Sequence, residues 1–452
     1  MTLNSTDRRR ERFRRIRLTG IATIASRGVS VVASLVTIPM TARFLGTERF
    51  GLWLLLGSFL TWGGLVDLGL GNSLTTEVAR ADGRDDRKVP RVLVSSAFFP
   101  VLAIAVAVSV FFAIVYSWIP WPRVMNVTGT VAASEAGAAV AVTAIVFVAR
   151  LPLGIASRLY SAYQEGYRYQ LWSGSAVALS IVLLKAAIAY NASLPTLLAS
   201  FFGTMLLGDV AASVDIFARR RRWLAPRLRY FDMRIARSLL STGLMFWIAQ
   251  IASILLLQTD LVLVARLFGA EAVADYGVAL RLFSVVSMVQ MAFASSLWPA
   301  YAEALERKDQ AWVSRTFFRS IVLATAWAVL ASLLLVACGG AVVRLLINGR
   351  DTPSQGLLAA MATTAVVSAI AQSFAMLLNG LGEIRIQAWL GFLSGVFNIA
   401  VSLVLGYLIG PAGVSLGTAF AILASVAVSA GFLRRKVGTL KAKPGFATKG
   451  AT

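Results

Sequence analysis

The chain has 452 residues, of which 58% are apolar and only 14% are charged, and its mean hydropathy is +0.75. So few charged side chains cannot cover the surface of a soluble globular protein of this length, which excludes that class. The single cysteine, Cys338, cannot form an internal disulfide, and the lack of histidine argues against metal chemistry and histidine catalysis.

Twelve membrane-spanning helices are predicted from the hydropathy, because a helix needs about 20 apolar residues to cross a bilayer. In chain order they lie near residues 18–40, 50–71, 92–118, 131–157, 170–190, 195–218, 239–264, 274–298, 317–347, 355–378, 388–410 and 411–433. The first apolar stretch is longer than the core of a signal peptide, so we expect it to be the first span. The predicted fold class is an all-α integral membrane protein without a separate soluble domain.

The basic residues predict the orientation, since cytoplasmic loops carry an excess of Lys and Arg. The amino-terminal segment, the carboxyl tail and alternate loops hold most of the 43 basic residues. The opposite loops hold only Arg43, Arg49, Arg123, Arg266, Arg344 and Arg350. Both termini are therefore predicted to be cytoplasmic. The net charge of +22 then reflects topology and attraction to anionic headgroups, and we expect no nucleic-acid partner.

Two pairs of segments repeat along the chain. Ala42–Glu48 resembles Ala265–Glu271 at an offset of 223 residues, and Arg168–Trp172 resembles Arg385–Trp389 at an offset of 217. Both matches fall in equivalent predicted loops of the two halves. Because each half holds an even number of spans, the halves enter the membrane in the same sense, as a parallel repeat. We expect two six-helix lobes around a cavity, an arrangement that is typical of transporters.

The predicted organisation has five parts. They are a basic cytoplasmic tail at 1–17, an N-terminal six-helix lobe at 18–218, a basic cytoplasmic linker at 219–238, a C-terminal six-helix lobe at 239–433 and a second basic tail at 434–452.

Four cations lie inside the predicted spans: Arg27, Arg150, Lys185 and Arg281. A charge at bilayer depth costs roughly 2.5 to 3.5 kcal/mol on insertion scales, so it tends to face a wet cavity, a partner or a ligand. Cations in such a cavity indicate an anionic cargo. We expect the inner pair, Arg27 and Arg150, to receive that cargo and the other two to line its later path.

Ordinary structural roles remain open for all four cations. Arg27 could pair with Asp67, and Arg281 could pair with Asp260, whereas Arg150 and Lys185 could extend to the membrane interface. Asp67 and Asp260 are counter-ions on this interpretation, and the alternative is that they bind a proton or cation for coupled transport.

Pro39 lies where the first predicted span ends, and it is a predicted hinge because proline removes a backbone donor and favours a kink.

Several motifs resemble one family. They are Pro39–Trp53, Asp67–Asn72, Thr259–Asp260, Ala274–Gly277, Leu297–Tyr301 and Leu378–Gly382, in this order. Together they resemble the polysaccharide-repeat flippases, which include the O-antigen and exopolysaccharide flippases, of the multidrug/oligosaccharidyl-lipid/polysaccharide (MOP) exporter superfamily. The resemblance covers almost the whole chain and implies a MATE-like transporter fold.

The resemblance also implies a function. The expected cargo is an undecaprenyl-diphosphate-linked oligosaccharide that moves from the inner to the outer leaflet of the bacterial cytoplasmic membrane, by alternating access and without a cofactor. Membrane lipids, and proteins of polysaccharide polymerisation and assembly, are the partners to expect.

Two other functions are alternatives to this one. A cation-coupled drug or metabolite antiporter of the same superfamily would depend on Asp67 or Asp260 more than on the arginines. A membrane enzyme would need large outer loops, and the predicted outer loops are short. Because the sequence also lacks a nucleotide-binding loop and a nucleophile elbow, we expect no enzymatic activity.

Overall fold

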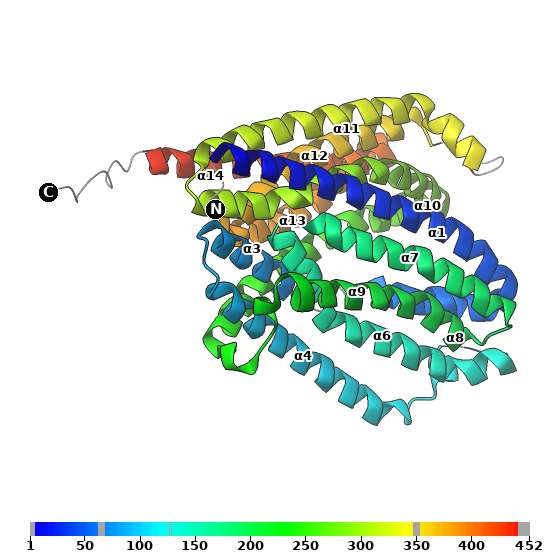
Figure 1. Ribbon diagram of the computed structural model, residues 1–452. Helices are drawn as coiled ribbons and strands as arrows, with labels where there is room; N and C mark the ends of the chain where they lie inside the picture. The colour runs from blue at the N-terminus through cyan, green and yellow to red at the C-terminus, as the bar shows by residue number, and fades with distance from the viewer. Residues whose placement is uncertain (1–4, 62–67, 126, 128, 347–352, 442–452) are drawn as a thin grey trace. The chain divides into compact units, whose positions relative to one another are not determined.

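The computed structural model describes residues 5–61, 68–125, 127, 129–346 and 353–441, and every regular element in these ranges is helical (Figure 1). Ten of the described helices are long and apolar enough to cross a membrane. The other two predicted spans lie in long helices. Residues 50–61 of the span near 50–71 belong to α1 (Ser5–Thr61), and the span near 239–264 belongs to α10 (Met233–Glu306). The predicted all-α membrane fold is confirmed.

The chain forms two compact units. Unit 1 comprises residues 1–247 and 295–312, and unit 2 comprises residues 248–294 and 313–452. Unit 1 thus continues through the predicted linker at 219–238 and also takes in the end of α10. The helix α10 runs through both units.

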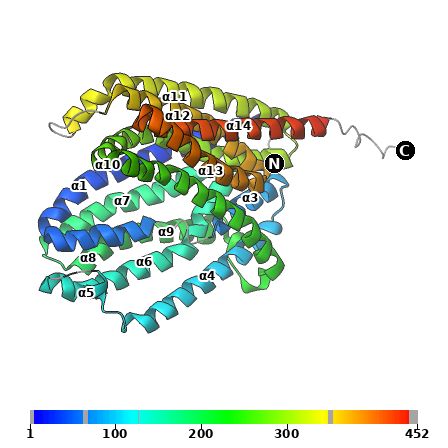
Figure 2. The same ribbon diagram turned by 180° about the vertical axis from the view of Figure 1, so that it is seen from behind.

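Unit 1 holds α1 and a series of shorter elements. These are α3 (Leu70–Gly83), α4 (Val89–Tyr116), α5 (Trp121–Val124), α6 (Thr130–Ala162), α7 (Gly166–Ala189), α8 (Leu194–Leu198), the π-helix η1 (Ala199–Gly203), α9 (Thr204–Val214), the π-helix η2 (Asp215–Arg220) and the 3₁₀ turns η3 (Arg222–Leu224) and η4 (Leu228–Tyr230). The helix α7 packs between α1 and α9, and α6 packs on α3, α4 and α9 (Figure 2). Leu74, Leu159 and Ile216 are fully buried in its core.

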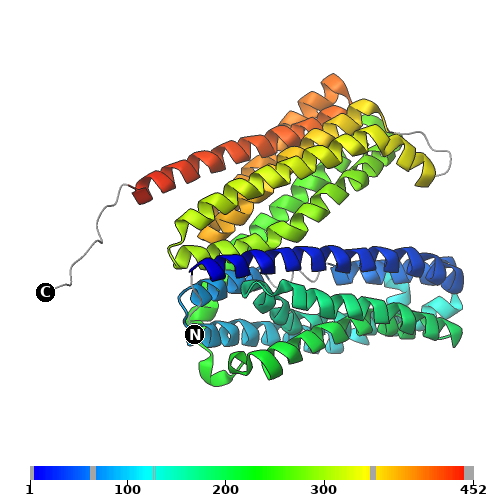
Figure 3. The ribbon, with the colours of Figure 1, turned by 45° about the horizontal axis from the view of Figure 1, so that its top comes forward.

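Unit 2 holds the middle of α10 and four further helices. They are α11 (Gln310–Leu346), α12 (Gln355–Leu381), α13 (Ile384–Ile409) and α14 (Pro411–Lys441). The helix α14 packs against both α12 and α13 (Figure 3). Val264, Ala328 and Leu358 bring α10, α11 and α12 together in one apolar core.

Two glycines at matched positions of the repeat bend the two longest helices. Gly46 in α1 has φ 71° and ψ 176°, and Gly269 in α10 has φ 81° and ψ −176°. This region of backbone space is essentially restricted to glycine. Gly46 and Gly269 are also the aligned glycines of the segment pair found in the sequence. The repeat is therefore reproduced in the backbone as well as in the residues.

The bend in α1 is not at Pro39. Pro39 lies inside the helix, and Gly46 is the residue of α1 with non-helical backbone angles in the described part. A hinge at Pro39 stays a prediction, and the observed change of helix direction belongs to Gly46.

Candidate functional site

A cavity of about 520 Å³ lies within unit 1 and is lined by cationic side chains from two helices. Arg27 reaches it from α1, and Arg150 and Arg158 reach it from α6. Leu74 of α3 and Val101 of α4 contribute to its apolar wall. The inner pair of cations that the sequence singled out therefore shares one cavity.

Arg150 pairs with the carboxylate of Asp209, which Tyr169 in turn holds in place. Its Nε donates to Oδ2 of Asp209 at 3.1 Å, and the Tyr169 hydroxyl donates to Oδ1 of the same carboxylate at 2.8 Å. Asp209 is only 5% exposed, whereas the Arg150 side chain is 39% exposed. The guanidinium is thus anchored on one edge and accessible on the rest. The sequence left extension to the membrane interface open for Arg150, and it did not predict this internal pair with Asp209.

Arg158 is the cavity cation that the sequence interpretation missed. The predicted span 131–157 ends just before it, but α6 continues to Ala162, so Arg158 lies within the helix. Its Nη1 donates to Oδ1 of Asn72 at 2.7 Å. Positions i, i+4 and i+8 share one broad stripe of a helix, and this spacing relates Arg150, Gly154 and Arg158. That spacing was the available signal.

Arg27 differs from the other two cavity cations. Its side chain is exposed, and no carboxylate of the described residues lies within 4.0 Å of its guanidinium nitrogens. The predicted partner Asp67 lies outside the described residues, so that alternative is untested. Within the described part of unit 1, Arg27 is available to an anion in the cavity.

Lys185 and Arg281 are placed elsewhere. Lys185 is exposed near the end of α7. Gly174 of the same helix lies against Ser26, the neighbour of Arg27 in α1. Lys185 is eleven residues beyond Gly174, which corresponds to about 17 Å of helix rise between the two. Lys185 is not among the residues that line the cavity. Arg281 is exposed on α10 in unit 2. Their role along a cargo path remains a prediction.

Asp260 is buried in unit 2 among neutral partners. Its carboxylate accepts hydrogen bonds from the Tyr276 hydroxyl at 3.0 Å, the Asn398 amide at 3.2 Å and the Thr418 hydroxyl at 2.7 Å. Arg281 forms no ion pair with it, so the counter-ion role considered for Asp260 toward Arg281 is wrong for this structure: neutral donors from three helices occupy its oxygens. Two motifs of the resemblance, around Asp260 and Tyr276, meet here.

A second cavity, of about 1080 Å³, lies in unit 1 where five predicted cytoplasmic segments converge. It is lined by Arg12 and Arg15 of α1, Asp82 and Asp85 after the second predicted span, Tyr163, Gln164 and Glu165 after α6, Arg220 and Arg221, and Glu303 and Arg307 of the α10 end. All five segments lie at one end of unit 1. This agrees with their assignment to one side of the membrane.

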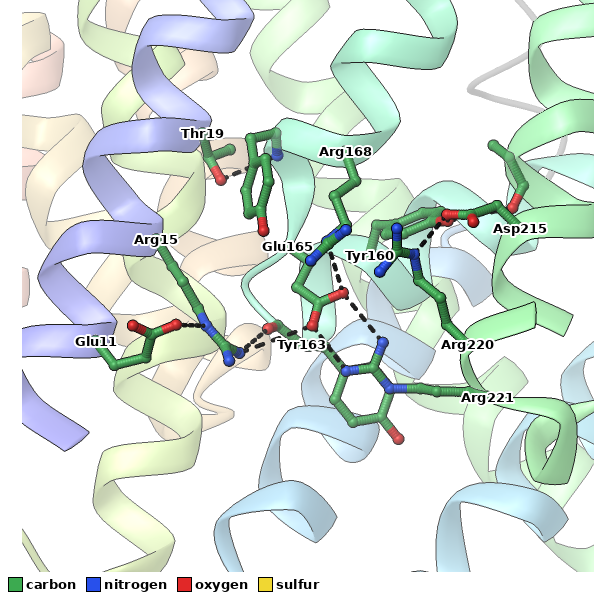
Figure 4. A network of polar contacts seen from close by, with 12 residues as sticks. Glu11, Arg15, Thr19, Tyr160, Tyr163, Glu165, Arg168, Asp215, Arg220 and Arg221 are labelled. Atoms are coloured by element: carbon green, nitrogen blue, oxygen red, sulfur yellow. Dashed lines mark hydrogen bonds and ion pairs between the residues drawn. The ribbon is translucent and has the colours of Figure 1, made fainter. Parts of the chain in front are cut away.

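Glu165 is the hub of the polar contacts in this second cavity (Figure 4). Its two oxygens accept from both terminal nitrogens of Arg221, at 2.9 and 3.1 Å, and Arg168 lies at 3.4 Å. Burial alone would raise the pKa of Glu165, but the hydrogen bonds and charge of Arg221, with Arg15 and Arg168, bring that pKa below its usual value. Glu165 is therefore an ionised anchor for the linker.

Asp82 behaves in the opposite way. Burial, reinforced by the negative charge of Glu303, raises the pKa of Asp82 to about 6, although Arg221, Arg307 and Arg15 act against the shift. The charge balance of this cavity therefore changes near neutral pH.

Comparison with known proteins identifies relatives of the chain. The family model for "Polysaccharide biosynthesis protein" matches residues 19–305, and the MatE model matches residues 246–404. A putative O-antigen transporter of Salmonella typhi is 21% identical over 360 residues, which cover 79% of this chain and 81% of that protein. A putative O-antigen export protein of Yersinia pseudotuberculosis is 21% identical over 291 residues, which cover 62% of this chain and 63% of that protein.

The fold has solved counterparts. The outward-facing conformation of a multidrug resistance MATE family transporter of the MOP superfamily superimposes with a TM-score of 0.79 at 16% identity, covering 94% of this chain and 96% of that one. The expected MATE-like fold is thereby confirmed, and at this identity the likeness speaks for the fold alone.

Proposed function

The chain belongs to the family of polysaccharide biosynthesis proteins, and from this premise we propose that it translocates a lipid-linked oligosaccharide across the bacterial cytoplasmic membrane. The proposed cargo is an undecaprenyl-diphosphate-linked repeat unit, moved from the inner to the outer leaflet by alternating access. The observation that carries the proposal is the convergence of Arg27, Arg150 and Arg158 on one cavity of unit 1.

The cavity suits a diphosphate. A guanidinium presents a planar fork of donors that pairs with two phosphate oxygens at once, and it keeps its charge at any physiological pH. Three guanidiniums line the cavity, and Asp209 is the one carboxylate among its described lining residues. The cavity therefore has an excess of positive charge. A polar head could therefore leave water for this cavity while its polyprenyl tail stays in lipid, and no bond has to be made or broken.

The three guanidiniums would take different parts. Arg150 is oriented in advance by Asp209, and Arg158 is oriented by Asn72. Such preorganisation lowers the entropy that binding must overcome. Arg27, exposed and without a carboxylate partner among the described residues, would make the strongest new contact with the cargo. Lys185 and Arg281 would serve later positions of the path.

The test is deletion of the gene, followed by measurement of lipid-linked oligosaccharide in each leaflet and by complementation. Wild-type protein should restore outer-leaflet delivery fully, and Arg27→Lys should restore it in part. Arg27→Ala should deliver at least about tenfold less than the wild type, as expected for loss of a charge-assisted contact of about 1.5–3 kcal/mol. Arg43→Ala is the matched control, because Arg43 is exposed on the same helix but does not line the cavity.

Each result bears on a different part of the proposal. Normal delivery after deletion would rule out the flippase function, and saturable export of a soluble cation would then favour the antiporter of the same superfamily. Full complementation by Arg27→Ala at normal expression would refute the cationic site while leaving the family assignment intact.

A further inference from the structure

The wall of the second cavity of unit 1, of about 1080 Å³, comes from the ends of helices. The turn at 163–165 joins α6 to α7, Arg221 follows η2, and the segment 303–307 closes α10. The helices that end there are long and apolar enough to cross a membrane. The cavity therefore lies where the chain leaves the hydrocarbon core, at the depth of the lipid headgroups.

Most charged side chains of this cavity already neutralise one another. The arginines that lie within 4.0 Å of a carboxylate are Arg12, Arg15, Arg220, Arg221 and Arg307. The lining acids held by these arginines are Glu11, Asp85, Glu165 and Glu303. Asp86 accepts from two backbone N–H groups at the start of α4. These groups leave little net charge for a ligand to meet.

One carboxylate and one guanidinium of the cavity are left over. Among the described residues, no Lys or Arg nitrogen lies within 4.0 Å of the Asp82 carboxylate, and no carboxylate lies that close to the Arg87 guanidinium. The two therefore do not pair with each other. A ligand that carries one positive and one negative group would match these two charges.

Two buried polar atoms of the same cavity lack a hydrogen bond. The Tyr163 hydroxyl and Gln164 Oε1 have no partner among the described residues, although the two residues are only 5% and 6% exposed. The Arg221 guanidinium lies over the Tyr163 ring, 3.9 Å from its centre (Figure 4). Burial raises the pKa of the Tyr163 hydroxyl, and Asp82 is the charged group that adds most to this rise. The hydroxyl thus faces the unpaired carboxylate.

The backbone holds Gln164 at a fixed place in the cavity wall. Its φ of 57° lies in the left-handed region, which residues other than glycine seldom adopt. The bonds on either side maintain this conformation, since Arg15 donates to the Tyr163 carbonyl at 3.0 Å and the Glu165 N–H donates to the Tyr160 carbonyl at 2.7 Å. The turn therefore presents its free polar atoms in a preorganised way.

The free groups are complementary to a primary ammonium. A primary ammonium has three N–H donors, which match a carboxylate, an amide oxygen and a hydroxyl oxygen. A quaternary ammonium has the same charge but no donor. The remaining guanidinium is suited to a phosphate, which it binds through charge-assisted hydrogen bonds.

We propose that this cavity binds an ethanolamine phosphate group, as carried by a phosphatidylethanolamine lipid. Its ammonium donates to Asp82, Gln164 and Tyr163, and its phosphate is bound by the Arg87 side chain. The depth of the cavity favours a lipid over a soluble compound as the source of this group. The proposal does not depend on which cargo the cavity of Arg27 carries.

The experiment is thermal unfolding of the purified full-length protein in detergent at pH 8. The protein is titrated with dihexanoylphosphatidylethanolamine, and with dihexanoylphosphatidylcholine as the matched compound without N–H donors. A ligand that binds only the folded state raises the unfolding temperature in a saturable way. The ethanolamine lipid should raise it by about 2–5 °C more than the choline lipid does.

Glycerophosphoethanolamine, which has no acyl chains, distinguishes the two sources of the headgroup. A saturable response to either ethanolamine compound supports the site. A response to the lipid at concentrations at least about tenfold lower would identify the lipid as the ligand, because its chains add apolar burial to the same headgroup contacts.

The binding should also depend on pH, because the ammonium needs an ionised Asp82. The charged and titratable groups that face Asp82 are Glu303, Arg307, Arg221, Arg15 and Tyr163. Burial and the charge of Glu303 raise the pKa of Asp82 to about 6. The affinity for the ethanolamine lipid should therefore be about tenfold lower at pH 5 than at pH 8.

Variants locate the headgroup. Tyr163→Phe removes a hydroxyl that bonds no described residue, so it should unfold like the wild type but bind the ethanolamine lipid about two- to tenfold more weakly. Asp82→Asn should bind it at least about tenfold more weakly. Tyr167→Phe is the matched control, because Tyr167 lies at the start of α7 and does not line the cavity. It should keep the full response.

Three results would overturn the proposal. One is an equal response of the wild-type protein to the ethanolamine and choline lipids. Another is an affinity that is the same at pH 5 and pH 8. The third is an unchanged affinity in both Tyr163→Phe and Asp82→Asn. The comparison of the two lipids on the wild-type protein decides the matter even if a variant fails to fold, and none of these readouts involves the cargo.

Discussion

Asp85 accepts hydrogen bonds from both terminal nitrogens of Arg307, each at 2.8 Å. The same guanidinium donates to the buried carboxylate of Glu303 and to the backbone oxygen of Asp82. Arg307 thereby joins the end of α10 to the turn after α3. The two carboxylates that Arg307 contacts differ in burial, since the side chain of Glu303 is 7% exposed and that of Asp85 is 70% exposed.

We expect Arg307→Gln to cost far more stability than Asp85→Asn. Loss of the guanidinium weakens the compensation of buried Glu303, which should lower the free energy of unfolding by about 2–3 kcal/mol. Asp85 is exposed, so its replacement should cost less than about 1 kcal/mol. Thermal unfolding of both variants in detergent measures the difference, and equal costs would show that the exposed pair dominates instead.

Asp82 makes stability depend on pH. Its pKa is raised from 3.8 to about 6 in the folded protein, so the folded state holds the proton more tightly than the unfolded state does. The resulting stabilisation is fully present below about pH 4 and is lost as the pH rises through 6. Asp82→Asn should therefore match the wild type near pH 4 and exceed it by up to about 3 kcal/mol near pH 8. Unfolding scans between pH 4 and pH 8 test this, and a constant difference across that range would contradict it.

Gly46 and Gly269 should resist substitution because of backbone strain alone. A Cβ on either residue meets no atom within 4 Å, yet both have positive φ. Gly46→Ala and Gly269→Ala should each lower the free energy of unfolding by about 1–3 kcal/mol. Gly51→Ala and Gly277→Ala are matched controls, since their Cβ atoms are also unobstructed and their φ angles are not in the positive range. These controls should be neutral or stabilising, and comparable losses in all four variants would exclude strain as the cause.

Asp209 and Tyr169 are expected to set the position of Arg150. Tyr169→Phe removes one hydrogen bond to Asp209 and should reduce outer-leaflet delivery about two- to tenfold, corresponding to about 0.5–1.5 kcal/mol. Asp209→Asn weakens the charge pair with Arg150 and should reduce delivery further. Complementation by each variant, with expression measured in parallel, gives the values. Wild-type delivery in both would mean that Arg150 needs no support.

The parts of this protein that follow local rules could be predicted from its sequence. Apolar length predicted the membrane helices, and the segment pair containing Gly46 and Gly269 predicted the repeat because matching residues take matching backbone angles. Arg27 and Arg150 were recognised because a cation inside an apolar stretch is conspicuous. Arg158 escaped because α6 extends five residues beyond the predicted span end at 157.

Features that depend on packing could not be predicted. The four-residue spacing of an α-helix predicts a pair between Asp215 and Arg219. In the structure Asp215 instead accepts from Arg220 at 2.7 Å. The reason is the π-helix η2, in which residues five apart come together. The buried carboxylate of Asp260 bonds Asn398 and Thr418, which lie 138 and 158 residues away in the sequence, and no sequence spacing marks such a meeting.

The bend at Gly46 also limits how the first two predicted passes can move. A loop between two helices supplies slack, so one helix can rotate without turning the next. Here helical geometry resumes directly after a single glycine, and one pair of backbone torsions must absorb any rotation. Any rotation of the segment that carries Arg27 is therefore passed to the following segment, except for the part that φ and ψ of Gly46 take up.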